Sequence, residues 1–406
     1  MRLVVIPPHF EPDVAPTGDV ATRIVHELGR RKHTIEVVTS FPWYRHHRIE
    51  PGYGGRLVRH EDTPWGRITR LHPFPTANKR NLVRRAAAYA SFSGLAAAHG
   101  ARGGPVDGVL AMSPPLTLGL TGGAVASARR APFVFNIQDV FPDVAVELGV
   151  ITDRRIISAA RRLERFCYER ADAITVLSED LRANVAAKTG RPDKIRVIPN
   201  FVDTDAVVPT DKDNAYRREF GLDGKTIVMY AGNVGLSQSL EIMLDAAGAL
   251  SYEEDLVFVI NGDGAARDEL ERKARDLSNV RFVDMQPLER VAEVYSAADV
   301  HVVPLKKGLA RSSVPSKTYS ILAAARPLIA SVDEGSEVAR IVERAGAGVA
   351  VPPEDSEAFT KVLRKLLDAP NELTRMGAAG RRFVETWASP AAVASAYETL
   401  FEELRR

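Results

Sequence analysis

A short segment in the second half of the chain combines residue types that could bind a phosphate group. Ser316, Lys317 and Thr318 are predicted to start a helix that runs to Ala325, with Ser316 as its N-cap. The backbone N–H groups at a helix N-terminus point outward and attract anions. The side chains of Lys317 and Arg311 would add full positive charges to this site. The alternative is that Lys317 is an ordinary solvated lysine of the first helical turn.

Two turns that follow predicted strands could also hold a ligand. The strand at 226–231 leads into a turn that contains Asn233, and a helix is expected from Gln238 to Leu250, so a diphosphate could lie between them. Gly262 follows the strand at 256–260, where the lack of a side chain leaves room for a ligand beside the backbone. Each turn alone has an equally good structural explanation, but both are expected at the same edge of one sheet.

A third candidate lies near the beginning of the chain. The strand at 2–6 is followed by a proline-rich loop and then by Gly18, at the start of a helix predicted over 19–31. A glycine there would let an anion approach the backbone N–H groups. The alternative is a plain helix start, capped by Asp19.

Strands and helices are predicted to alternate along the whole chain, which is typical of α/β proteins with parallel sheets. The strands expected in the first half are 2–6, 34–39, 108–112, 133–137, 173–177 and 195–198. Those of the second half are 226–231, 256–260, 280–283, 300–303, 328–330 and 348–351. The fold class is therefore α/β, with two doubly wound (Rossmann-like) domains in tandem.

The pattern pauses in a polar stretch after residue 200, which indicates a domain boundary. We expect an N-terminal domain over 1–205, a second domain over 206–385, and a terminal helix over 386–406 that packs back on the first domain. Ligands of such sheets bind beyond the carboxyl ends of the strands. A cleft between the two domains is the expected site.

The composition is that of an ordinary soluble enzyme. The 406 residues are 45% hydrophobic and 26% charged, and the single cysteine, Cys167, cannot form an internal disulfide. No Cys/His cluster has the spacing of a metal site. The N-terminus lacks the pattern of a signal peptide, and no apolar run is long enough to span a membrane. We therefore expect a cytoplasmic location.

The charge is distributed unevenly. The net charge of +2 divides into +10 over residues 1–200 and −8 over residues 201–406. The segment 44–85 alone carries ten cationic side chains: Arg45, Arg48, Arg56, Arg59, Arg67, Arg70, Lys79, Arg80, Arg84 and Arg85. An anionic membrane face, an anionic acceptor or nucleic acid could bind such a surface, and a merely solvated face is equally compatible with it. The stretch 78–95 could lie on a membrane as an amphipathic helix.

Several motifs together resemble one enzyme family along nearly the whole chain. The chain resembles the retaining glycosyltransferases of family 4, which have the glycosyltransferase-B fold. The most specific stretches are RADAITVLSE at 170–179 and IRVIPNFVD at 195–203, joined by matches at 163–165, 230–233, 261–264, 295–300, 315–317 and 327–331. The stretch QDVFPD at 138–143 resembles bacterial surface-polysaccharide transferases in particular.

The chain departs from the family pattern at several positions. Asn233 and Gln238 stand where many members hold the donor diphosphate with an arginine and a lysine, and serines stand at 312 and 320 in place of a pair of glutamates. Glu337 is the expected substitute for the lost ribose-binding carboxylate. A histidine common after the fourth strand is replaced by Gln138, which leaves Asp139 as the nearest polar candidate.

The resemblance also implies a reaction. A nucleoside-diphosphate sugar, UDP- or GDP-linked, would donate its sugar with retention of configuration to a saccharide or polyprenyl-diphosphate-linked acceptor. The leaving phosphate oxygen would take the acceptor proton, so no side-chain nucleophile, metal or other cofactor is expected. Asp139 would orient or polarise the acceptor, although a structural role as a loop or cap residue explains it nearly as well. The donor would be held by Gly18, Asn233, Gln238, Gly262, Arg311, Ser316, Lys317, Thr318 and Glu337.

Three other functions remain compatible with the sequence. A sugar-nucleotide epimerase can share the architecture, and the departures from the family pattern would also suit a catalytically silent, nucleotide-sugar-binding scaffold. A nucleic-acid-binding protein could use the basic first half, but no helix-turn-helix or aromatic-rich basic module is present, so nucleic acid is not an expected partner.

Overall fold

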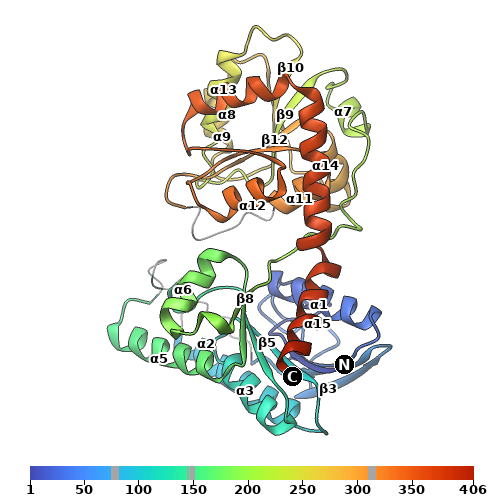
Figure 1. Ribbon diagram of the computed structural model, residues 1–406, viewed down its shortest axis with the longest axis vertical. Coiled ribbons are helices and arrows are strands. Elements are labelled where there is room, and N and C mark those ends of the chain that lie inside the picture. Colours follow the sequence, from blue (N-terminus) through green and yellow to red (C-terminus); the bar gives the residue numbers. More distant parts are fainter. Residues whose placement is uncertain (75–81, 144–145, 147–150, 310–316) are drawn as a thin grey trace. The chain divides into compact units, whose positions relative to one another are not determined.

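The computed structural model describes residues 1–74, 82–143, 146, 151–309 and 317–406, and its chain divides into two compact units. Unit 1 comprises residues 1–200 together with 390–406, and unit 2 comprises residues 201–389. Each unit is built on its own sheet, which Figure 1 shows with its helices. The polypeptide thus leaves unit 1 after Asn200 and re-enters it at Pro390.

The sheet of unit 1 has eight strands in the order β3-β4-β2-β1-β5-β6-β7-β8. All neighbours are parallel except β3 and β4, which pair as an antiparallel hairpin at one edge. The chain reverses its direction of strand addition at β1, since β2 lies on one side of it and β5 on the other. The strands are β1 (Arg2–Ile6), β2 (Thr34–Ser40), β3 (Val58–Thr63), β4 (Gly66–Leu71), β5 (Gly108–Ser113), β6 (Phe133–Ile137), β7 (Ala173–Val176) and β8 (Ile195–Val197).

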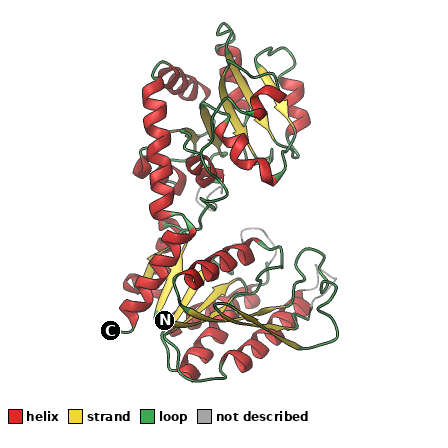
Figure 2. Cartoon of the chain, turned by 90° about the vertical axis from the view of Figure 1, so that its right-hand side faces the viewer, coloured by secondary structure: helices red, strands yellow, loops and turns green. Residues whose placement is uncertain are grey.

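The helices of unit 1 are α1 (Pro16–Arg30), α2 (Leu82–Gly100), α3 (Leu118–Arg129), α5 (Arg154–Arg170), α6 (Glu179–Thr189) and α15 (Pro390–Leu404). Figure 2 shows helices on both faces of this sheet. Helices α1 and α15 contact each other, and α2 packs against α3. Carboxylate Glu398 of α15 accepts hydrogen bonds from Arg31 (3.0 Å) and His33 (2.7 Å), which ties the C-terminal helix to unit 1.

A buried polar network also joins α15 to the sheet. The amide group of Asn136 in β6 donates to the hydroxyl of Tyr397 in α15 (2.9 Å) and to that of Thr175 in β7 (3.0 Å). Gln138 donates in turn to the Asn136 carbonyl oxygen (2.7 Å). Buried polar groups are costly unless they are paired, so this network fixes how β6, β7 and α15 pack.

The sheet of unit 2 has six parallel strands in the order β11-β10-β9-β12-β13-β14. This is the doubly wound order 3-2-1-4-5-6, and its reversal lies between β9 and β12. The strands are β9 (Thr226–Ala231), β10 (Leu256–Asn261), β11 (Val280–Val283), β12 (Val300–Pro304), β13 (Leu328–Ser331) and β14 (Gly348–Val351). The helices are α7 (Ala215–Glu219), α8 (Glu241–Ala249), α9 (Arg267–Lys273), α10 (Val291–Ser296), α11 (Lys317–Ala323), α12 (Glu337–Ala345), α13 (Ser356–Leu367) and α14 (Pro370–Trp387). The predicted α/β fold class with two doubly wound sheets is therefore confirmed.

Some local expectations were wrong. Helix α1 begins at Pro16 and its N-cap is Ala15, so Asp19 does not cap it and pairs instead with Arg23 (3.0 Å). Helix α8 begins at Glu241 rather than at Gln238, because residues 236–238 form a turn. The basic segment 44–85 contains the hairpin β3–β4, which the sequence analysis did not predict.

The hairpin reduces the basic surface that the sequence suggested. Arg70 is buried and donates to Glu61 (2.9 Å), which also pairs with Arg59, while Arg67 pairs with Asp62. Lys79 and Arg80 lie outside the described residues, and the side chains of Arg84 and Arg85 are not described. Within the described part of the chain, no helix is both long and apolar enough to cross a membrane.

Candidate functional site

Lys317 occupies the position in unit 2 where a doubly wound sheet usually binds its ligand. It is the first residue of α11, which follows β12, and its side chain reaches across to the carboxyl end of the neighbouring strand β9. Its ammonium nitrogen lies 3.8 Å from the centroid of the Tyr230 ring and 3.1 Å from the point where a Cβ on Gly232 would stand. The lysine therefore bridges the two strands between which the strand order reverses.

A chain of hydrogen bonds fixes this lysine. Its Nζ donates to the hydroxyl of Tyr230 (2.5 Å), and that hydroxyl donates to the carbonyl oxygen of Asn233 (2.5 Å). Burial lowers the pKa of Lys317 to about 7 and raises the pKa of Tyr230, because both groups lose hydration of their charged forms. Among the described residues no carboxylate pairs with Lys317, so its positive charge is uncompensated.

The loops after β9 and β10 are joined by their backbones. Gly232 N–H donates to Asn261 O (2.9 Å), and Val234 N–H donates to Asp263 O (2.8 Å). Gly262 has φ +155°, and a Cβ there would lie 1.9 Å from Gly232 O. The neighbouring loop thus gives Gly262 a structural reason to be glycine, and its role in donor binding stays a prediction.

Two side-chain amides converge on the first of these loops. Oε1 of Gln238 accepts a hydrogen bond from Gly235 N–H (2.9 Å), and a Cβ on Gly235 would lie 2.7 Å from Nδ2 of Asn233. The assignment of oxygen and nitrogen in Gln238 follows from its backbone donor. The structure thus places Asn233 and Gln238 against Gly235, and Lys317 against Gly232, so that all three side chains contact the same loop after β9.

The other predicted residues of unit 2 lie in different surroundings. Thr318 is buried, and its hydroxyl oxygen has no partner among the described residues. Glu337 is the first residue of α12, where its buried carboxylate accepts from Nη2 of Arg340 (2.7 Å). Arg311 and Ser316 lie outside the described residues, and with them the predicted N-cap.

Asp139 lies two residues after the end of β6 in unit 1, at the carboxyl edge of the sheet. Although its side chain reaches solvent, the surrounding protein removes enough hydration to raise its carboxyl pKa. No hydrogen bond or ion pair involves this carboxyl within the described part of unit 1. Its neighbour Gln138, by contrast, is buried and belongs to the network of Asn136 and Tyr397.

Gly18 lies in the first turn of α1 and is buried. A Cβ at this position would stand 2.9 Å from the Cβ of His9, so α1 can approach the loop after β1 only with glycine here. This contact explains the glycine by packing, and anion binding at Gly18 stays a prediction.

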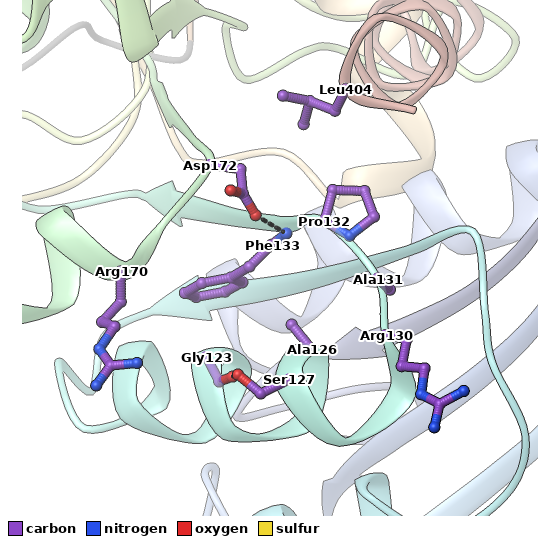
Figure 3. A pocket seen from close by; sticks show the side chains of 10 residues that line it. All are labelled: Gly123, Ala126, Ser127, Arg130, Ala131, Pro132, Phe133, Arg170, Asp172 and Leu404. Atoms are coloured by element: carbon purple, nitrogen blue, oxygen red, sulfur yellow. Dashed lines mark hydrogen bonds between the residues drawn. The ribbon is translucent and has the colours of Figure 1, made fainter. Parts of the chain in front are cut away.

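A separate hollow of about 580 Å³ lies at the amino-terminal end of β6. Figure 3 shows Arg130 and Arg170 on either side of it, and the carboxylate of Asp172 accepts from Phe133 N–H (2.8 Å). Because ligands of doubly wound sheets bind at the opposite, carboxyl edge, we do not assign the site here.

The sequence analysis missed Tyr230. The stretch 230–233 entered the sequence analysis only as part of the family resemblance, and Tyr230, the next-to-last residue of β9, was given no role. Its contact with Lys317 joins residues 87 positions apart, which no local pattern reveals.

Comparisons with known proteins match both units. The family model described as "Glycosyl transferases group 1" matches residues 225–369, and the model described as "Glycosyl transferase 4-like domain" matches residues 17–200. The probable glycosyltransferase WbjE of Pseudomonas aeruginosa is 29% identical over 77% of this chain and 78% of its own. The putative colanic acid biosynthesis glycosyl transferase WcaI of Escherichia coli is 27% identical over 92% and 94%. The crystal structure of HepE from Anabaena in complex with UDP superposes with a TM-score of 0.64 at 13% identity, covering 100% of both chains.

Proposed function

Because the chain belongs to the family 4 glycosyltransferases, with glycosyltransferase-B architecture, we propose that it is a retaining enzyme that uses a UDP- or GDP-linked sugar. The two glycosyltransferase family models support sugar transfer, and the relatives' names and the UDP complex of HepE support a nucleotide-sugar donor and a place in polysaccharide biosynthesis. The proposed acceptor is a saccharide or a polyprenyl-diphosphate-linked oligosaccharide. We further propose that unit 2 binds the donor and unit 1 the acceptor.

The uncompensated charge of Lys317 carries this proposal. A buried ammonium group without a carboxylate partner is unfavourable, and the lowered pKa of Lys317 expresses that cost. A donor diphosphate beside Gly232 would supply the missing negative charge. The side-chain amides of Asn233 and Gln238, which lie against Gly235, would then donate hydrogen bonds to the oxygens of the diphosphate.

The proposed mechanism needs positioning and charge stabilisation rather than a protein nucleophile. As the bond between the sugar and the diphosphate breaks, the leaving oxygen gains negative charge and takes the proton of the attacking acceptor hydroxyl. A preorganised cation such as Lys317 stabilises that charge, and one well-placed donor contributes about 3 kcal/mol in comparable sites. Since a fixed cation serves the diphosphate, we propose that the reaction is independent of metal ions. Asp139 would orient the acceptor hydroxyl.

A ligand screen followed by product analysis tests the function. Thermal shift with UDP, GDP, ADP and dTDP should identify one preferred nucleotide, since saturation at one hundred times Kd stabilises the protein by about 2.7 kcal/mol. The ¹H NMR signal of the product's anomeric proton should show the same configuration as the donor. The rate of sugar transfer should be the same with and without EDTA. An inverted product would contradict retention, isomerisation of the donor without acceptor would indicate an epimerase, and the absence of any nucleotide binding would overturn the proposal.

A peripheral membrane contact is also proposed, because a lipid-linked acceptor would be presented at a membrane. Arg45 and Arg56 are exposed, lie on the loop between β2 and β3, and form no described ion pair. Each could contribute about 1 kcal/mol near an anionic surface. We expect the protein to cosediment with vesicles of phosphatidylglycerol but not with vesicles of phosphatidylcholine. A protein that binds neither kind of vesicle would refute the contact.

A further inference from the structure

A histidine and an aspartate form a close pair in the loop that follows β1. Nδ1 of His9 donates to Oδ2 of Asp13 at 2.7 Å, and the two side chains are 11% and 2% exposed. The other carboxylate oxygen, Oδ1, accepts from the backbone N–H groups of Trp43 (3.1 Å) and Tyr44 (2.9 Å). Asp13 is therefore fully engaged, and it joins the loop after β1 to the loop after β2.

The pair determines which ring nitrogen of His9 carries the proton and which can accept a hydrogen bond. Since the carboxylate accepts from Nδ1–H, the neutral imidazole carries a lone pair on Nε2. No hydrogen bond to Nε2 occurs among the described residues. Asp13 already fixes the two loops through the backbone, so the imidazole is not required for that purpose, and its acceptor atom is left available.

Two aromatic rings lie beside this imidazole. The ring centroid of His9 lies 5.7 Å from that of Trp43 and 5.0 Å from that of Tyr44, which stands edge-on to it. Tyr44 is 42% exposed, and Trp43 is partly exposed. We refer to His9, Asp13, Trp43 and Tyr44 as the His9 cluster.

The position of the His9 cluster in the fold is that of a ligand site. The cluster follows the carboxyl ends of β1 and β2, and β1 is the strand at which the order of unit 1 reverses. Binding sites combine apolar or aromatic walls with a few oriented polar groups. A sugar presents both apolar C–H groups, which suit aromatic faces, and hydroxyl groups, which suit an oriented hydrogen-bond acceptor.

We propose that the His9 cluster is the saccharide acceptor subsite, in which Nε2 of His9 accepts a hydrogen bond from an acceptor hydroxyl and Trp43 and Tyr44 contact the sugar ring. Asp13 is a positioning residue, because it fixes the tautomer and orientation of His9. The inference rests on the proposed function and specifies which residues of unit 1 contact the acceptor sugar.

Saturation-transfer difference NMR on the full chain tests the inference. The probes are methyl α-D-glucopyranoside, methyl α-D-mannopyranoside and methyl β-D-galactopyranoside, each with saturating UDP. We expect signal transfer to at least one glycoside, a loss of at least tenfold in its affinity in His9→Ala, and an unchanged Kd for UDP. The imidazole ¹⁵N resonance of Nε2 in His9 should shift when that glycoside is added, which a purely structural histidine would not do.

The matched control is His26→Ala. His26 also pairs with a carboxylate, Glu11, at 2.6 Å, but it lies outside the His9 cluster. Its loss should leave glycoside binding unchanged. Should His9→Ala fail to fold, the exposed Tyr44→Ala provides the same comparison.

The outcomes distinguish a failure of the proposed function from a failure of the inference about the His9 cluster. If UDP and every other nucleotide fail to bind to the parent protein, the proposed function fails. If nucleotide binds but no glycoside shows transfer, or if His9→Ala and Tyr44→Ala bind the glycoside as tightly as the parent, the inference about the His9 cluster fails alone.

Discussion

The ammonium group of Lys317 lies against the ring of Tyr230, 3.8 Å from its centroid and 2.5 Å from its hydroxyl oxygen. A cation over an aromatic face is attracted to it, and this contact holds the lysine in place without neutralising it. The site thus holds an oriented amine for an anionic ligand, and this amine is positively charged below its pKa of about 7.

Lys317→Ala should weaken donor binding. Loss of a hydrogen bond that involves a charged group costs about 1.5–3 kcal/mol, which corresponds to an increase of roughly tenfold to a hundredfold in the Kd of the preferred nucleotide. Isothermal titration calorimetry measures this change, and Lys361→Ala, at an exposed position of α13, serves as the control. An unaltered Kd in Lys317→Ala would remove this residue from the site.

Donor affinity should decrease as the pH rises above neutrality. The pKa of Lys317 is lowered to about 7 in the free protein, whereas a bound diphosphate favours the charged form and raises that pKa. Above pH 7 the free lysine is increasingly neutral, so binding must take up a proton, and Kd should increase by up to about tenfold per pH unit. Calorimetry in buffers of different ionisation enthalpy would detect the proton uptake. The Lys317→Met variant should lack it, and a proton uptake that persists in this variant would assign the effect elsewhere.

Asp139→Asn should lower turnover while the fold stays intact. The carboxyl makes no described hydrogen bond, so its replacement should change the melting temperature little, whereas a lost acid–base or orienting contact typically reduces kcat by about a hundredfold or more. Gln138→Ala is the contrasting neighbour: it leaves the buried Asn136 carbonyl unpaired and should cost about 1–3 kcal/mol of unfolding free energy. Full activity in Asp139→Asn would exclude this residue.

Much of the fold could be predicted from the sequence, because buried parallel strands contain continuous apolar runs such as residues 256–260 of β10. The hairpin β3–β4 could not, since its first strand, Val58–Thr63, has charged or polar residues at every position after Val58 and lies at the edge of the sheet. Lys317 could be singled out from its helical position. Its contact with Tyr230 depends on how α11 packs beside β9, and the contacts of His9 and Asp13 with Trp43 and Tyr44 depend on how the loops after β1 and β2 pack.

Gly262→Ala should destabilise unit 2 strongly. The new Cβ would lie 1.9 Å from Gly232 O at a φ of +155°, so the joined loops after β9 and β10 would have to separate. Urea denaturation should show that Gly262→Ala lowers the free energy of unfolding by several kcal/mol, which is among the largest effects of single substitutions. Gly248→Ala, at the next-to-last position of α8 with only an ordinary contact to Leu277, should be neutral or stabilising by up to about 0.5–1 kcal/mol. Equal stability of the two variants would contradict the observed loop packing.

The return of the chain to unit 1 at Pro390 affects how the protein can be recombined. Unit 2 is one continuous insertion, whereas unit 1 needs Tyr397 from the far end of the polypeptide to satisfy Asn136. A chimera that exchanges everything after residue 200 for the corresponding part of a relative would therefore pack the relative's C-terminal helix against the native core of unit 1. A graft limited to 201–389, with two junctions, would transfer the whole second sheet and preserve the native partner of β6.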